Sequence, residues 1–150
     1  MRVVIQRVSE ANVSIDNSIT GAIGKGLLIL LGIEEGDASA DIDWLCPKIA
    51  KLRIYNDENG LMNLSFQDVD GEILLISQFT LFASSRKGNR PSYIRAARPE
   101  TAIPLYEEFI LKMEKEIQKK VQTGVFGADM KIHLINDGPV TIIIDSKMKE

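Results

Sequence analysis

Strand-length apolar runs outnumber helical segments in this sequence, and that imbalance limits the folds open to it. Seven or eight short runs have the pattern of β-strands, whereas only two segments have helical spacing. The run from Leu27 to Leu31 is apolar throughout, which is typical of a strand covered on both faces. Two helices cannot cover both faces of so many strands, so the sheet must curl or close. We therefore predict an α/β fold in which a largely antiparallel or mixed β-sheet curls into a barrel-like core with two main helices packed on it.

The two helices are expected on either side of the strongest strand. The first begins after a capping residue, Asp37 or Ser39, and its apolar residues recur at helical spacing as far as Leu52. Pro47 lies inside it and should kink it or split off a first turn, because proline lacks the amide donor and clashes one turn back. The second helix is expected from about Thr101 to Val121.

Length and composition predict an ordinary globular protein. The 150 residues suit one domain, which we expect to span 1–150. No apolar run approaches the ~20 residues that span a bilayer, and the start of the chain lacks the pattern of a signal peptide. A single cysteine excludes an internal disulfide and is typical of a reducing compartment. We therefore expect a cytoplasmic protein without a membrane partner.

The scarcity of histidine and cysteine limits the chemistry. His133 and Cys46 are the only residues of their kinds, so a zinc site of Cys and His ligands, which needs four, is excluded. Cys46 falls on the apolar face of the first expected helix, where a small core residue is the simpler interpretation. His133 alternates with apolar residues in a strand and should face solvent or a polar partner. An enzyme of this sequence is expected to work without a side-chain imidazole, and we predict no metal and no cofactor.

Basic residues gather in one loop of an otherwise acidic chain. Segment 84–98 has no acidic residue and five basic ones: Arg86, Lys87, Arg90, Arg95 and Arg98. The whole chain carries −3, and the 13 basic and 21 acidic residues outside this group give −8. A basic loop rich in Gly, Pro and Ser, with Tyr93 inside it, suits contact with phosphates and stacking of a base. On charge alone, a solvated loop is an equal alternative.

Two polar blocks interrupt the expected strands. Ser77-Gln78-Phe79-Thr80 lies in a strand expected from Ile73 to Phe82, and Asn136-Asp137-Gly138-Pro139-Val140-Thr141 precedes another apolar run. Burying an unpartnered polar group costs roughly 1–3 kcal/mol, so such blocks either end strands or build a site. By itself, Asp137-Gly138-Pro139 is most simply a hairpin turn. The residues alone thus indicate a polar site beside a basic loop.

Four ordered blocks of the sequence resemble the signature motifs of the D-aminoacyl-tRNA deacylase family. They are Ser77 to Leu81, Lys87 to Ser92, Thr123 to Met130 and Asn136 to Thr141. The opening, Arg7 to Val13, is also similar, and the likeness runs essentially from Met1 to Asp145. The resemblance implies a homodimer that hydrolyses the ester joining a D-amino acid to the 3′-terminal ribose of tRNA, and so releases free D-amino acid and tRNA.

The resemblance also implies roles for individual residues. The Gly138-Pro139 element of one subunit, in the cis form, would enter the other subunit's active site and aim its carbonyls at the substrate's α-amino group. The pocket wall opposite would be formed by Ser77, Gln78, Phe79 and Thr80. Asn136 and Thr141 would hold the turn, Arg7 would brace it, and Phe126 and Met130 would line the pocket for the terminal adenosine. We assign contact with tRNA to Arg86, Lys87, Arg90 and Arg95.

The chemistry that the resemblance implies needs little from side chains. An aminoacyl ester is activated and lies beside a ribose hydroxyl that can assist its hydrolysis, so the protein must chiefly position it and stabilise the oxyanion. We favour the backbone N–H groups of Phe79 and Thr80 as oxyanion donors, with the Thr80 hydroxyl as nucleophile the alternative. A chiral filter made of backbone atoms does not sense the side chain, so glycyl-tRNA should be hydrolysed too. A non-catalytic nucleic-acid-binding protein on the same fold is the alternative function, although it would not need to keep the polar block and the Gly-Pro turn.

Overall fold

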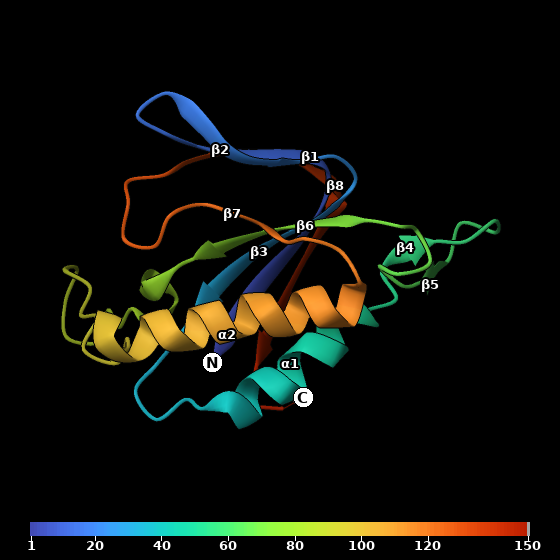
Figure 1. Ribbon diagram of the computed structural model, residues 1–150. Coiled ribbons are helices and arrows are strands. Elements are labelled where there is room, and N and C mark those ends of the chain that lie inside the picture. Colours follow the sequence, from blue (N-terminus) through green and yellow to red (C-terminus); the bar gives the residue numbers. More distant parts are fainter. Residues whose placement is uncertain (150) are drawn as a thin grey trace.

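A mixed six-stranded sheet forms the centre of the computed structural model, which describes residues 1–149 (Figure 1). In order across the sheet, its strands are β2 (Ser18–Ile23), β1 (Arg2–Ile15), β3 (Gly26–Gly32), β6 (Glu72–Ser77) and β7 (Gln122–Thr123), with β8 (Lys131–Asp145) paired to β1 along nearly its whole length. β1 is antiparallel to its three neighbours, whereas β3, β6 and β7 run parallel. A separate two-stranded sheet pairs β4 (Tyr55–Asn56) with β5 (Met62–Leu64).

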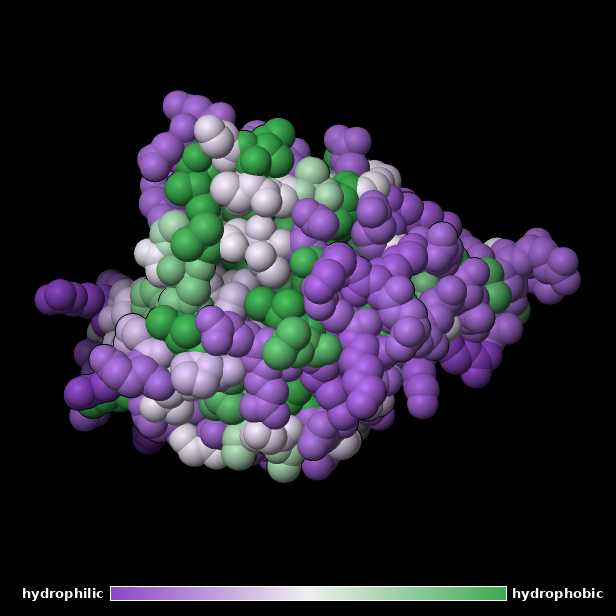
Figure 2. Space-filling view, in the orientation of Figure 1, coloured by the Kyte–Doolittle hydropathy of each residue, from purple (hydrophilic) through white to green (hydrophobic). Residues whose placement is uncertain are grey.

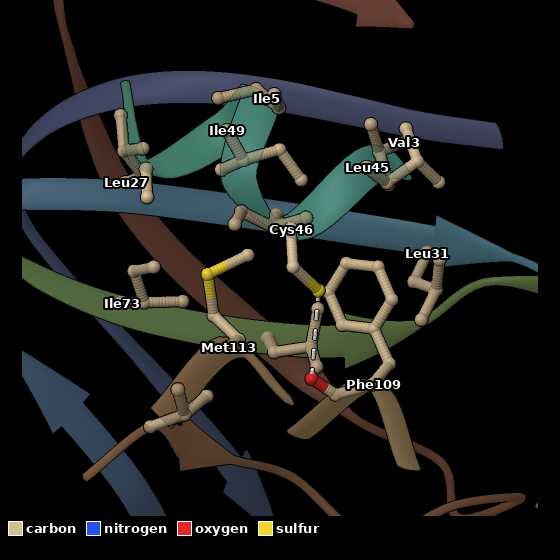
Figure 3. Close-up of a cluster of buried hydrophobic side chains, with 14 of the residues drawn as sticks. Val3, Ile5, Leu27, Leu31, Leu45, Cys46, Ile49, Ile73, Phe109 and Met113 are labelled. Carbon is tan, nitrogen blue, oxygen red and sulfur yellow. Dashed lines mark hydrogen bonds between the residues drawn. The ribbon is translucent and has the colours of Figure 1, made fainter. Parts of the chain in front are cut away.

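Two helices, α1 (Ser39–Ala50) and α2 (Pro99–Ile117), lie side by side against one face of the sheet (Figure 1). Their apolar stripes pack on the side chains that β1, β3 and β6 direct toward them, as Figure 3 shows for Ile5, Leu27 and Ile73. An ion pair between Lys112 and Asp43, 2.7 Å apart, ties the two helices together near their exposed sides. Neither helix in residues 1–149 combines the length and apolarity that crossing a bilayer requires.

The sheet curls so that its own strands cover the face opposite the two helices. Leu28 and Leu74, whose neighbours in sequence point toward the helices, belong to a second buried cluster together with Val8 of β1. Ile132 and Leu134 of β8 pack against this cluster. The predicted α/β fold, with a mixed sheet curled into a barrel-like core and two main helices on it, is confirmed.

The helix ends differ from the prediction for local reasons. The N-cap of α1 is Ala38, whose N–H donates to the Asp41 carboxylate at 2.9 Å, so neither predicted capping residue caps the helix. Pro47 lies inside an unbroken α1, so of the two effects predicted for it, a kink or a split of the first turn, the split is wrong. α2 begins two residues before Thr101 and ends at Ile117, because Gln118 adopts a left-handed conformation with φ of 55°.

Two strand predictions were also wrong. The strand expected from Ile73 to Phe82 stops at Ser77, and a 3₁₀ helix, η1 (Phe79–Phe82), follows it. The Gly-Pro segment is a bulge in one strand rather than a hairpin turn, since the residues on both its sides pair with β1: Asn136 lies opposite Val8 and Thr141 opposite Gln6. Proline has no N–H to give to the ladder, so a bulge is the way a long strand accommodates it.

Cys46 lies in the core between the two helices. Its side chain is fully buried, and its Sγ is 3.9 Å from the carbonyl oxygen of Phe109 (Figure 3). Burial raises the pKa of the Cys46 thiol to about 12. The thiol is therefore protonated at neutral pH and carries no nucleophilic chemistry.

Candidate active site

A cavity of about 240 Å³ opens where the parallel strands β3 and β6 end, a common place for ligand sites in sheets with parallel strands. The start of α2 and the loop after β7 close its sides, on the flank of the molecule where Figure 2 shows apolar and neutral residues gathered. Hydrophilic residues dominate the opposite flank, toward β4 and β5 (Figure 2). The lining is apolar apart from Ser77 and Gln78, and comprises Leu31, Ile33, Ile76, Ser77, Gln78, Phe79, Ala97, Ala102, Phe126, Gly127, Ala128, Met130 and Ile132.

The first polar block forms one wall of this cavity. The N–H of Gln78 donates to the Leu31 carbonyl at 2.7 Å, which extends the β3–β6 ladder by one bond before the chain turns into η1. The first amide of η1 that finds an acceptor is that of Leu81, which donates to the Gln78 carbonyl at 3.2 Å. The N–H groups of Phe79 and Thr80 therefore have no acceptor in the described part of the chain, as is usual at a helix start.

The Thr80 side chain is turned toward its own block rather than into the cavity. Its Oγ1 accepts a hydrogen bond from Gln78 Nε2 at 2.6 Å, and Thr80 is not among the lining residues. Phe126 and Met130, by contrast, do line the cavity, and Phe126 also packs against Tyr106 of α2 with ring centroids 5.7 Å apart. The structure thus brings the Ser77–Phe79 wall and the Phe126–Met130 segment together.

Gly138 and Pro139 do not reach this cavity within one chain. Ser77 lies level with Leu31 of β3 and Val3 of β1, whereas the Gly-Pro bulge lies near Arg7, four residues farther along β1 and on the far side of it. From the spacing of strands and the rise per residue, the two polar blocks are about 20 Å apart along the sheet. The Gly138-Pro139 peptide bond is cis, and both residues are exposed.

Arg7 holds the Gly-Pro bulge from its buried side. Its side chain is buried, its Nε donates to the Asp137 carbonyl at 2.9 Å, and its Nη1 donates to the Ile54 carbonyl at 2.6 Å. The guanidinium also lies over the ring of Tyr55, 5.9 Å from its centroid. These contacts connect the bulge to the loop before β4, so its backbone is fixed on the buried side.

A second set of hydrogen bonds closes the bulge across itself. Asn136 Oδ1 accepts from the Val140 N–H at 2.9 Å, and its Nδ2 donates to Thr141 Oγ1 at 3.0 Å. Gly138 has φ of 139°, and a Cβ atom there would lie 2.8 Å from Val140 Cγ2 and 3.0 Å from Arg7 Nη2. The position therefore accepts only glycine without rearrangement.

The basic loop is anchored at its base and exposed at its tip. Ser84 and Ser92 exchange backbone hydrogen bonds of 2.8 and 2.9 Å, and the residues between them are exposed. Arg86, Lys87 and Arg90 make no ion pair with any residue in 1–149.

Arg95, the fourth basic residue assigned to tRNA contact, has partners within the protein. Its Nη2 lies 2.8 Å from Glu34 Oε2, and its guanidinium lies 5.3 Å from the centre of the Phe82 ring. These contacts attach the end of the basic loop to the segment after β3. Arg95 is thus already engaged, whereas the other three cations are available to a ligand.

The cavity lining holds no imidazole, thiol or carboxylate. His133 is exposed on β8 opposite Asn12, away from the cavity. Within residues 1–149, no three His, Cys, Asp or Glu side chains are grouped so as to hold a metal. The arrangement therefore offers an apolar cavity, two unpaired backbone donors and one polar wall, which suits positioning and oxyanion stabilisation better than acid–base catalysis.

Known proteins match this chain over its whole length. The family described as D-Tyr-tRNA(Tyr) deacylase matches residues 4–145. Relatives named D-aminoacyl-tRNA deacylase from Flavobacterium psychrophilum and Bacteroides fragilis (strain YCH46) are 64% and 63% identical over 150 residues, covering all of this chain and all of each relative. The chain belongs to the D-aminoacyl-tRNA deacylase family. The resemblance inferred from the four motif blocks is confirmed, and the chain is a hydrolase.

Solved structures agree in fold. One, named c-Myc DNA Unwinding Element Binding Protein, has a TM-score of 0.90 at 38% identity and covers 97% of this chain and 98% of its own. Another, of a probable eukaryotic D-amino acid tRNA deacylase, has a TM-score of 0.77 at 14% identity, over 95% of this chain and 97% of that one. The second, more distant match shows that the fold persists when most residues differ.

The apolar lining of the site in this deacylase family member, other than Phe79, Phe126 and Met130, was not predicted. Leu31 and Ile76 could have been found, because both lie at the ends of strongly apolar strands whose carboxyl ends meet in a parallel pair. Ala97 and Ala102 carry no sequence signal, since small residues at the start of a helix are common. They line the cavity only because α2 begins beside it.

Proposed function

We propose that the chain hydrolyses the ester bond of D-aminoacyl-tRNA and of glycyl-tRNA, and so corrects mischarged tRNA. The observation that carries this proposal is a cavity without an acid or base whose wall includes Phe79, the first of two consecutive residues, Phe79 and Thr80, with unpaired amides. An aminoacyl ester is among the few substrates activated enough to need only positioning and an oxyanion site. The size of the cavity suits the end of a larger molecule, with the rest of the tRNA lying outside.

In the proposed mechanism, water attacks the ester carbonyl and the ribose 2′-hydroxyl relays the proton of that water to the ribose 3′-oxygen. The bond between the carbonyl carbon and the 3′-oxygen then breaks, which releases the amino acid and the tRNA with its 3′-hydroxyl restored. The N–H groups of Phe79 and Thr80 donate to the developing oxyanion, and each such donor is worth about 10²–10³ in rate. Two observations favour these donors over a Thr80 nucleophile. The Thr80 Oγ1 already accepts a hydrogen bond from Gln78, and no side chain of the cavity lining could take its proton.

The proposed active form is a homodimer in which the Gly138-Pro139 bulge of each chain completes the cavity of the other. Within one chain the bulge and the cavity are separated, yet the bulge is exposed and its shape is held by Arg7 and Asn136. Ile135 and Ile143, on either side of the bulge, are 55% and 67% exposed. Apolar side chains around an ordered, exposed segment suit a surface that a second copy covers.

The Gly-Pro carbonyls account for the proposed selection between D- and L-substrates. Directed at the α-amino group, they would define where the substituents of the α-carbon can lie without touching the side chain itself. The L-isomer would then place its side chain against the protein backbone. Glycine has no side chain to clash, so glycyl-tRNA passes the same filter.

Release of the free amino acid tests the proposed function directly. Purified protein should release labelled D-amino acid from D-aminoacyl-tRNA and glycine from glycyl-tRNA, while the matching L-aminoacyl-tRNA stays charged. The alternative is a non-catalytic nucleic-acid-binding protein, and it is supported by the 38% identity to a protein named for binding a DNA element. Binding of tRNA without release of any amino acid would support that alternative and contradict the proposal.

Salt dependence tests the proposed contact with tRNA. Three available cations on the basic loop imply about three phosphate contacts, each contributing roughly 0.7–0.9 to the slope of log affinity against log salt. Arg90→Ala should weaken tRNA binding and lower that slope by about one contact. Lys149→Ala is the control, because Lys149 lies over Trp44 on α1 and should leave the slope unchanged. A slope that implies eight or more contacts would contradict the picture of a protein that touches only the acceptor end.

A further inference from the structure

Two exposed aromatic rings stand beside the cavity, and the proposed mechanism uses neither. The side chains of Phe79 and Tyr93 are 56% and 39% exposed, and their rings meet edge to face with centroids 5.1 Å apart. Phe79 also lines the cavity, so the pair begins where the cavity ends. The next residue, Ile94, is 88% exposed. A contiguous exposed apolar surface beside a cavity is typical of a binding site.

The backbone around Tyr93 is held in place without any occupant. Ser92 is bonded to Ser84 in both directions, and the Tyr93 carbonyl accepts the Ala96 N–H at 3.0 Å. The Ala97 N–H then donates to the Ile33 carbonyl at 2.9 Å. Tyr93 therefore lies between two anchored points, and an occupant would not have to pay for ordering the loop.

The charge around the pair indicates a polyanion. Arg86, Lys87 and Arg90 lie on the same loop and are exposed without ion-pair partners in residues 1–149. The acidic side chains that contact the end of the loop, Glu34 and Glu35, accept hydrogen bonds from the Arg95 guanidinium and from the backbone N–H of Arg98. Flat aromatic faces next to available cations are the arrangement that binds unpaired nucleotides, with rings stacking on bases and cations on phosphates.

We propose that Phe79 and Tyr93, with Ile94 beside them, form a stacking platform for the unpaired base that precedes the terminal adenosine of tRNA. The inference rests on the proposed function, because it requires the terminal adenosine and its ester to occupy the cavity. Phe79 belongs to both the cavity wall and the aromatic pair, so the two sites are adjacent, as consecutive nucleotides are. The platform fixes the direction in which the acceptor end leaves the cavity.

Two substrates of different length test the platform. A D-aminoacyl-tRNA carries the preceding base, whereas a 3′-D-aminoacyl-adenosine lacks it. In Tyr93→Leu, the ratio of kcat/KM for the tRNA to kcat/KM for the adenosine ester should fall about tenfold, within the roughly 5- to 150-fold range that loss of one stacked base brings. Tyr93→Phe keeps the ring and should keep the ratio. Leu111→Ala, an exposed apolar residue on α2, is the control for a change in surface apolarity.

Any of three other outcomes would contradict the proposed stacking platform. An equal loss on both substrates would mean that Tyr93 supports the cavity, and an unchanged ratio would mean that no base stacks there. A Tyr93→Leu variant that weakens self-association in sedimentation while the ratio stays constant would show that a second subunit covers the pair.

A binding measurement separates failure of the platform from failure of the proposed function. A short single-stranded RNA with the 3′ sequence of tRNA should bind the wild-type protein more tightly than adenosine monophosphate does, and Tyr93→Leu should remove about tenfold of that difference. The result does not depend on hydrolysis. If the RNA binds no more tightly than adenosine monophosphate, the platform does not exist, whatever the protein hydrolyses.

Discussion

Phe79→Pro should hydrolyse a D-aminoacyl ester about 10²- to 10³-fold more slowly than Phe79→Ala, because only the proline variant loses an oxyanion donor. Phe79 is the first residue of η1, where proline is tolerated, and Gln78 before it has φ of −144° and ψ of 81°, outside the α region that a following proline disfavours. The substitution thus removes the N–H with little change in backbone. Both variants lose the phenyl ring, so their ratio isolates the amide. The measurement is single-turnover hydrolysis of 3′-D-aminoacyl-adenosine.

Thr80→Ala distinguishes the backbone donors from a hydroxyl nucleophile. It retains the Thr80 N–H and should keep most of the activity, because the hydroxyl it removes is hydrogen-bonded to Gln78 and turned away from the cavity. Thermal unfolding of each variant controls for loss of structure. Equal rates in Phe79→Pro and Phe79→Ala would exclude the amide of Phe79 as a donor. A Thr80→Ala variant as inactive as Phe79→Pro would establish the hydroxyl as nucleophile.

Gly138→Ala should lower activity by about 100-fold or more while the chain stays folded. The added Cβ would meet Val140 and Arg7 at 2.8 and 3.0 Å, and alanine rarely adopts φ of 139°. The bulge must therefore shift, and a displacement of about 1 Å of a positioning group can cost 10²-fold in rate. Gly60→Ala is a control, because Gly60 has φ of 77° and nothing within 4 Å of its Cβ position, and it lies in the turn between β4 and β5. If the two alanine variants lose the same activity, the effect comes from backbone strain alone.

Mixed dimers test whether the bulge acts across subunits. Gly138→Ala chains have an intact Phe79 wall, and Phe79→Pro chains have an intact bulge. If the bulge completes the partner's cavity, a 1:1 mixture that exchanges subunits should regain about a quarter of the wild-type activity, since half of the dimers then carry one complete site of two. A bulge that served its own chain would give no recovery. An active wild-type monomer would contradict the proposed dimer as well.

The residues of the cavity wall and of the Gly-Pro bulge could be singled out from the sequence, but the backbone that holds them could not be predicted. The block from Ser77 to Thr80 was expected inside a strand, because Leu81 and Phe82 continue its apolar pattern. In the structure, Gly32 ends β3 beside Ser77, so the ladder has no further partner and the chain turns into η1. That turn leaves the amides of Phe79 and Thr80 without acceptors. A ladder ends where its neighbour ends, and no local sequence pattern contains that information.

The backbone of the Gly-Pro segment likewise could not be predicted from its local sequence. Local turn chemistry indicates a hairpin at Asp137-Gly138-Pro139, and an isolated peptide of that sequence would have no reason to continue as a strand. β1 is long enough to pair with both sides of the segment, so β8 continues and the proline is accommodated in a bulge. The buried Arg7 fills the space beneath it.

The order of the motif blocks, the single basic loop, the two helical stripes and the excess of strands are properties of the sequence alone, and they determined the family and the curled sheet. These features are local or depend on residue identity, so they need no knowledge of the neighbouring strands. The tertiary structure alone decided where β6 stops and which amides remain unpaired. It also decided that Glu34 holds Arg95 and that the Gly-Pro bulge lies on a different surface from the cavity. Each of these depends on contacts between residues far apart in the chain, because a hydrogen bond or an ion pair exists only where the fold supplies the partner.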